Sequence, residues 1–156
     1  MVISVDFDGT CVTHEFPIIG KNIGAEIVLK ELCNAGHQII CTSMRSSKDK
    51  ERYGIDTVKE AKDWFNKNGI ELYGFNDNPS QHEWSDSRKI YAHAYIDDQF
   101  LGVPLTYYKY FGERFFVDWY LIASLLSQDG FITPQQYLEI KDKLMKEYPN
   151  IYKKHS

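Results

Sequence analysis

The sequence predicts an α/β protein in which a parallel central sheet is flanked by helices. Short apolar runs alternate with segments whose apolar residues recur at helical spacing, which favours βαβ units and parallel strands. Polar side chains follow directly after the first, second and fourth of these runs, and ligands gather at that end of parallel strands. A chain of 156 residues suits one domain with a full hydrophobic core.

Four short apolar segments predict the strands of this sheet. The first runs directly into Asp6, the second into Thr42 and the fourth into Asp97. Because the carboxyl ends of parallel strands lie at one edge of a sheet, these polar residues are expected to share that edge. In chain order, the predicted strands are 1–5, 37–41, 70–75 and 91–96.

Four other segments predict helices. After the first strand, apolar residues recur at helical spacing until the stop signal at Gly36, and a second such pattern stops at Gly69. Near the end of the chain, Thr133 is the predicted N-cap of a helix that begins at Pro134. In chain order, the predicted helices are 23–34, 55–68, 115–126 and 134–145.

The remaining segments predict loops. Residues 11–20 show no period and include Pro17, so they are expected to form a flap over the end of the first strand. Residues 46–53 are polar and charged, and residues 76–88 predict an irregular polar loop. Two side chains in these loops are open to two interpretations: His14 contacts substrate or has no role in a site, and Trp84 stacks on a base or anchors its loop.

Charge and cysteine content limit the class of protein. The net charge of −4 disfavours a polynucleotide partner, although it leaves room for a local basic patch. Three cysteines without a CxxC pair argue against a disulfide framework or a zinc site and fit a reducing cytoplasm. The chain has neither an apolar run of membrane-spanning length nor a signal-peptide pattern, so we expect a cytoplasmic protein with no membrane partner.

Two carboxylates follow the first predicted strand. Asp6 and Asp8 are two positions apart, so in strand geometry they point to the same side, and Gly9 lets the backbone approach a ligand closely. Two like charges in one small volume are unfavourable unless a cation or a shared proton relieves them. A bound metal with phosphate chemistry would provide that relief; an ordinary Asp- and Gly-containing turn is the alternative.

Four motifs in order along the chain resemble those of the haloacid dehalogenase-like (HAD) phosphohydrolases. They are Val5-Asp6-Phe7-Asp8-Gly9-Thr10, the strand-terminal Thr42, Lys89 and Tyr95-Ile96-Asp97-Asp98. The resemblance covers roughly residues 1–105 and is nearest to small members without a sizeable cap domain. It implies a Rossmann-like HAD fold in a single domain over 1–156, with a core of about 1–105 and extra C-terminal helices over about 106–156.

The resemblance assigns catalytic and metal-binding roles. Asp6 would be the nucleophile that forms an aspartyl-phosphate, and Asp8 the general acid and base. Lys89, for which Arg88 is the rival, would compensate the charge of nucleophile and phosphate. Mg²⁺ would bind the carboxylate of Asp6 and the backbone carbonyl of Asp8. The acidic pair that follows the fourth strand would complete the site, and which member binds directly stays open: Asp97 and Asp98.

A third group of residues would bind the substrate phosphate. The resemblance assigns the Thr42 hydroxyl to a phosphate oxygen, for which an ordinary strand-end hydroxyl is the alternative. Ser43 lies beside it, and Gly9 contributes its exposed backbone. Arg45 could bind phosphate through two hydrogen bonds, for which a solvated loop arginine is the alternative.

The expected function is therefore a Mg²⁺-dependent phosphatase that acts on a small phosphorylated metabolite or nucleotide. Two other classes stay open, namely a non-catalytic phosphate-ligand binding or regulatory module and an enzyme that processes polynucleotide phosphate ends. The sequence separates neither hydrolysis from transfer to another acceptor nor a monomer from a homo-oligomer.

Overall fold

The computed structural model describes residues 1–155 and confirms the parallel sheet flanked by helices. The four strands lie in the order β3-β2-β1-β4, and every neighbouring pair is parallel. Each strand falls inside a segment predicted from its apolar run. The strands are β1 (Val2–Val5), β2 (Gln38–Cys41), β3 (Leu72–Phe75) and β4 (Ala94–Ile96).

The register of the sheet aligns three strand ends. Val5 at the end of β1 is paired with Cys41 of β2 on one side and with Ile96 of β4 on the other. The next residues along the three strands are therefore neighbours at one edge of the sheet, as the sequence predicts. They are Asp6, Thr42 and Asp97.

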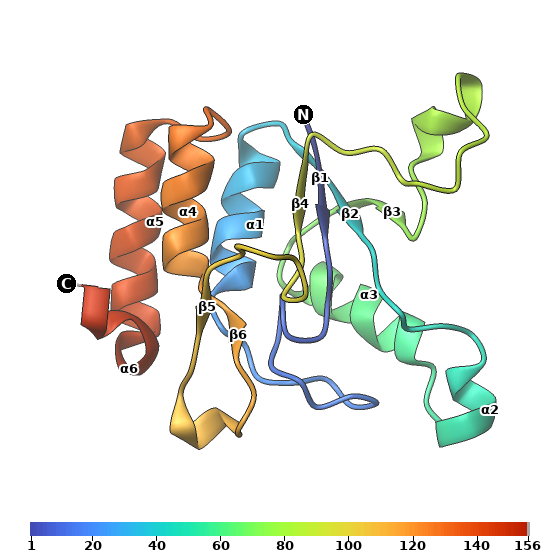
Figure 1. Ribbon diagram of the computed structural model, residues 1–156, viewed down its shortest axis with the longest axis horizontal. Coiled ribbons are helices and arrows are strands. Elements are labelled where there is room, and N and C mark those ends of the chain that lie inside the picture. The colour runs from blue at the N-terminus through green and yellow to red at the C-terminus, as the bar shows by residue number, and fades with distance from the viewer. Residues whose placement is uncertain (156) are drawn as a thin grey trace.

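The two faces of the sheet are covered differently. One face packs against helices α1 (Ala25–Asn34) and α3 (Thr57–Lys67), and its residues belong to the main core. In Figure 1, α1 lies between the sheet and the helix pair α4 (Trp119–Gln128) and α5 (Pro134–Glu147). The other face carries Val2 and Ile40, which form a smaller cluster with Tyr73 of β3 and with Ile90 and Ala92 from the segment that precedes β4.

The predicted helix over 115–126 begins later than expected. Phe116–Val117 (β6) pairs with Leu105–Thr106 (β5) in a small antiparallel hairpin, and Asp118 then caps α4 by accepting a hydrogen bond from the Leu121 N–H at 3.1 Å. The apolar residues at 115–117 continue the helical pattern, so the sequence pattern alone does not mark this boundary. The long-range pairing with β5 decides it.

Three smaller differences lie in segments predicted as loops or left unassigned. Part of the polar stretch 46–53 forms a short helix, α2 (Asp49–Tyr53), and the irregular loop 76–88 contains a 3-10 helix over Pro79–Glu83. A further short helix, α6 (Pro149–Tyr152), follows α5. The capping box of α5 is present as predicted, with Gln136 N–H donating to Thr133 Oγ1 at 3.2 Å. Within residues 1–155, no helix combines the length and the apolar character that a membrane span needs.

Candidate functional site

Three carboxylates gather at the aligned strand ends. Asp6 follows β1, and its backbone N–H donates to Ile96 O at 2.9 Å, which continues the β1–β4 ladder by one residue. Asp97 and Asp98 follow β4, and one carboxylate oxygen from each of the three residues lies within 4.8 Å of the others. Three of the four aspartates predicted for the metal site therefore form one cluster: Asp6, Asp97 and Asp98.

The cluster perturbs the ionisation of Asp6. Burial, together with the neighbouring carboxylates of Asp97 and Asp98, raises the pKa of Asp6 to about 7. Hydrogen bonds from the Phe7 backbone N–H and the Thr10 hydroxyl (3.2 Å) act in the opposite direction. The ionised cluster is therefore electrostatically unfavourable by itself, which is the situation that a bound cation relieves.

This pKa predicts how stability depends on pH without metal. Because the folded pKa of Asp6 is about 7 and the ordinary value is 3.8, its contribution to stability is complete below pH 4 and is lost as pH rises through 7. Asp6→Asn removes this titration. In EDTA, the free energy of unfolding of the variant minus that of the wild type should increase between pH 4 and pH 8, by up to about 4 kcal/mol. Urea unfolding at several pH values tests this, and a constant difference between the two proteins would contradict it.

Asp98 is fixed by two contacts and has one free oxygen. Its Oδ2 lies 2.9 Å from His14 Nε2, and its backbone N–H donates to Thr10 Oγ1 at 3.0 Å. Thr10 also donates to Asp6 Oδ2, so a single hydroxyl connects the two strands of the cluster. Asp98 Oδ1 is buried without a hydrogen-bond partner. A buried carboxylate oxygen of this kind is normally satisfied, and a metal ion would satisfy it here.

Gly9 makes the contact between His14 and Asp98 sterically feasible. Its φ is +90°, and a Cβ at this position would lie 2.1 Å from His14 Nε2 and 2.8 Å from Asp98 Oδ2. The Gly9 N–H donates to Val12 O at 2.8 Å, so in this structure it is engaged within the loop. Gly9 was expected to let the backbone approach a phosphate; the structure shows that it gives space to a histidine.

Asp8 and Arg45 form a two-point ion pair. Arg45 Nε and Nη2 donate to the two carboxylate oxygens of Asp8, both at 2.7 Å. The other guanidinium N–H groups donate to the backbone carbonyls of Ile18 (3.0 Å), Pro17 (3.2 Å) and Thr57 (3.3 Å). Arg45 is only 2% exposed, so this arrangement leaves it no donor for a substrate phosphate. It connects Asp8 to the flap and to the start of α3.

The predicted phosphate-binding hydroxyls lie at the edge of the site. Thr42 Oγ1 is 2.9 Å from Ser4 Oγ, beside the end of β1. Ser43 exchanges two hydrogen bonds with the side chain of Asn76, from its N–H (2.7 Å) and to its carbonyl (2.8 Å). Asn76 directly follows β3 and has a φ of 52°. The sequence analysis missed Asn76, although its position after the third strand is the same signal that identified the other strand ends.

Lys89 lies beside the ring of Tyr95. It is exposed in the segment that precedes β4, and its Nζ is 5.8 Å from the centre of the Tyr95 ring. Within residues 1–155, Lys89 forms no ion pair with a carboxylate at 4.0 Å or less. Its role as the charge that compensates Asp6 stays a prediction.

Comparison with known structures identifies a relative. A solved structure of a conserved protein from Bacteroides thetaiotaomicron superposes with a TM-score of 0.62 at 33% sequence identity, over 83% of this chain and 91% of that one. The chain belongs to the same family as this Bacteroides protein. A scan of family models and a search of curated proteins found no match. Membership of the Bacteroides protein's family establishes shared ancestry of the fold, and the activity has to be argued from the site.

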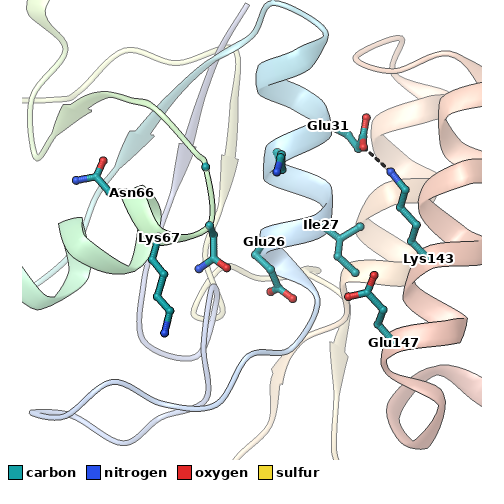
Figure 2. Close-up of a pocket in the computed structure, with 10 residues that line it drawn as sticks. Glu26, Ile27, Glu31, Asn66, Lys67, Lys143 and Glu147 are labelled. Atoms are coloured by element: carbon teal, nitrogen blue, oxygen red, sulfur yellow. Dashed lines mark hydrogen bonds and ion pairs between the residues drawn. The ribbon is translucent and has the colours of Figure 1, made fainter.

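A pocket between α1, α5 and the end of α3 lies apart from the acidic cluster. Figure 2 shows this pocket of about 540 Å³, which is lined by residues of α1, α5 and the end of α3. Lysine and glutamate side chains alternate around it, and Glu31 and Lys143 form an ion pair at 2.6 Å. None of the residues predicted for catalysis, metal or phosphate binding lines this pocket. The acidic cluster is therefore a separate site.

Proposed function

We propose that the protein is a Mg²⁺-dependent phosphatase of the HAD type that forms an aspartyl-phosphate on Asp6. The convergence of Asp6, Asp97 and Asp98 carries this proposal, because it combines three close carboxylates with a buried, unpartnered Asp98 oxygen. Thr42 lies at the same sheet edge, where it can donate a hydroxyl to a phosphate oxygen.

The donor set fits Mg²⁺. This ion prefers hard oxygen ligands and is commonly held by one or two carboxylates together with water and substrate phosphate. Asp6, Asp97 and Asp98 would hold it, and when bound it neutralises negative charge on the phosphoryl oxygens. The proposal includes the Asp8 backbone carbonyl as a further ligand. It assigns direct binding to one member of the pair Asp97 and Asp98.

His14 is a positioning residue in this proposal. Its contact with Asp98 Oδ2 directs the other carboxylate oxygen toward the cluster, in the manner of groups that orient metal ligands. His14→Ala should therefore weaken Mg²⁺ binding about 10-fold. Calorimetric titration measures it, and the exposed His82→Ala is the matched control. Equal affinity of the His14 variant and the wild type would show that the contact does not position Asp98.

The reaction divides between Asp6 and Asp8. An Asp6 carboxylate oxygen attacks phosphorus, forming a new P–O bond as the bond to the leaving oxygen breaks. Asp8 gives a proton to that oxygen. It later takes one from a water that attacks the same phosphorus, as the bond from phosphorus to Asp6 breaks and inorganic phosphate leaves. Each Asp8 oxygen accepts one hydrogen bond from Arg45 and keeps a second lone pair, which can exchange the proton with substrate or water. Arg45 thus sets the position from which Asp8 acts.

The decisive experiment is hydrolysis of an aryl phosphate and of a panel of phosphorylated metabolites by the purified protein. Turnover should appear with Mg²⁺ and disappear with a chelator. Absence of metal-dependent turnover across the whole panel would contradict the proposal.

One observation favours a second candidate, a module that binds a phosphate ligand without turning it over. The Asp8–Arg45 pair has 2.7 Å contacts at both oxygens, so Asp8 can serve as the structural partner of a buried arginine without acting as a proton carrier. Tight Mg²⁺-dependent phosphate binding without hydrolysis would support this alternative.

A further inference from the structure

A second pocket lies on the sheet face opposite α1 and includes Tyr95 of β4. It encloses about 300 Å³ between the segment 81–92 and β4. Pockets of this size are within the range that binds small ligands. Its main lining side chains are Trp84, Ser85, Ser87, Lys89, Tyr91 and Tyr95.

Three aromatic rings of this pocket are exposed to solvent. Trp84 is 61% exposed, Tyr91 45% and Tyr95 36%. The Trp84 and Tyr91 rings meet edge to face, with centroids 5.6 Å apart. Exposed large aromatic side chains gathered around one cavity are typical of a binding surface rather than of a core.

Hydrogen bonds from two buried amides and from the Tyr95 hydroxyl hold the segment in place. Tyr95 OH donates to Ile90 O at 2.7 Å and accepts the Ala92 N–H at 3.0 Å. The buried Gln81 amide donates to the carbonyls of Ser87 and Lys89, both at 2.9 Å, and accepts the Tyr91 N–H at 2.8 Å. Asn78 donates to Tyr91 O at 2.8 Å. These hydrogen bonds fix the backbone through polar groups, and the faces of the aromatic rings remain available to a ligand.

The polar groups around the rings are donors. The Ser85 and Ser87 hydroxyls each accept a backbone N–H, at 3.1 and 3.2 Å, and each can still donate its own hydrogen. Lys89 adds an ammonium group beside the Tyr95 ring. Flat rings surrounded by donors suit a flat heteroaromatic ligand that carries hydrogen-bond acceptors, which is the chemistry of a nucleobase.

The pocket and the acidic cluster lie on one face of β4. Tyr95 precedes Asp97 by two positions, so both side chains point to the same face, about 7 Å apart along the strand. Tyr95 is paired in register with Ser4, whose hydroxyl contacts Thr42. One ligand can therefore extend from the strand-end residues to the aromatic pocket.

We infer that this pocket binds the base of a mononucleotide whose phosphate lies at the acidic cluster. The inference rests on the proposed phosphatase function and specifies its substrate class. A cavity of about 300 Å³ with one lysine suits a single base. The net charge of −4 disfavours a polynucleotide. Lys89 then acts in substrate binding rather than beside Asp6.

Tryptophan fluorescence tests this inference directly. Trp84 is the exposed tryptophan, whereas Trp64 is 7% exposed and Trp119 is fully buried. The full chain is titrated with adenosine and uridine 5′-monophosphates and with ribose 5-phosphate, which lacks the base. The titration is made first in EDTA and then with Mg²⁺, which should tighten nucleotide binding because the phosphate lies at the acidic cluster. Saturable quenching by the nucleotides and none by the base-free sugar phosphate is the expected result, and Trp84→Phe should abolish the signal.

Variants separate the pocket from non-specific binding. Tyr91→Ala should weaken nucleotide binding about 10-fold, as expected for loss of one stacking partner, with Trp84 still reporting. Tyr110→Ala, which removes a 68% exposed tyrosine outside the pocket, should bind as the wild type does.

Three outcomes would overturn the inference: equal affinity for ribose 5-phosphate and nucleotides, unchanged affinity of Tyr91→Ala, and binding of single-stranded DNA without mononucleotide binding. Because the titration in EDTA measures binding and not turnover, its failure is distinguishable from failure of the phosphatase proposal.

Discussion

Replacement of Asp6 by asparagine is expected to reduce Mg²⁺-dependent hydrolysis of an aryl phosphate by at least about 1,000-fold. The amide cannot attack phosphorus, and loss of the nucleophile removes the covalent route as a whole. Asparagine has nearly the same shape as aspartate and removes one of three crowded charges, so the fold should persist. The loss then reports on chemistry and not on unfolding.

Steady-state kinetics of wild type, Asp6→Asn and Asp142→Asn measure this effect. Asp142 is an exposed acid on α5, so its variant controls for the change of net charge. Acid quenching during turnover should also trap a phosphorylated wild-type protein and none of the Asp6 variant. A variant that keeps a tenth or more of the wild-type rate would exclude Asp6 as the nucleophile.

Arg45→Met is expected to destabilise the protein by about 3–5 kcal/mol. Methionine has a similar volume, but it leaves the Asp8 carboxylate and three backbone carbonyls without their donor in a nearly buried site. For a chain of this length, such a change lowers the melting temperature by about 10 °C. The exposed Arg114→Met should change it by less than about 2 °C and serves as the matched control.

A double variant separates the ion pair from the general effect of the substitution. Asp8→Asn together with Arg45→Met removes both charges, so its loss of stability should be smaller than the sum of the two single losses. Chemical unfolding of the four proteins gives this coupling. Additive losses, or a single Arg45 variant within about 1 kcal/mol of the wild type, would show that the pair does not carry the stability assigned to it.

The Arg45 contacts also bear on catalysis, because the same guanidinium contacts Asp8, the flap and α3. A change in the flap on substrate binding would act on Asp8 through this group. The two largest expected effects are therefore linked: Asp6 is the proposed nucleophile, and Arg45 holds Asp8, the proposed proton donor to the leaving oxygen.

The sequence by itself determined the strands and the residues that end them. Short apolar runs marked β1, β2 and β4, and parallel pairing then placed Asp6, Thr42 and Asp97 at one edge. These features follow from local periodicity and from the geometry of parallel sheets, so a single sequence contains them. The HAD resemblance assigned their roles, which stay proposals.

Only the tertiary structure decided which side chains from distant loops meet at the site. Arg45 lies 37 positions from Asp8 and His14 lies 84 positions from Asp98, and no periodic pattern relates either pair. Their contacts depend on the path of the flap and on the space that Gly9 leaves open. For the same reason Lys89, although it matches a motif by spacing, lies beside Tyr95: the loop before β4 is held by Gln81, and contacts of that kind are set by three-dimensional packing.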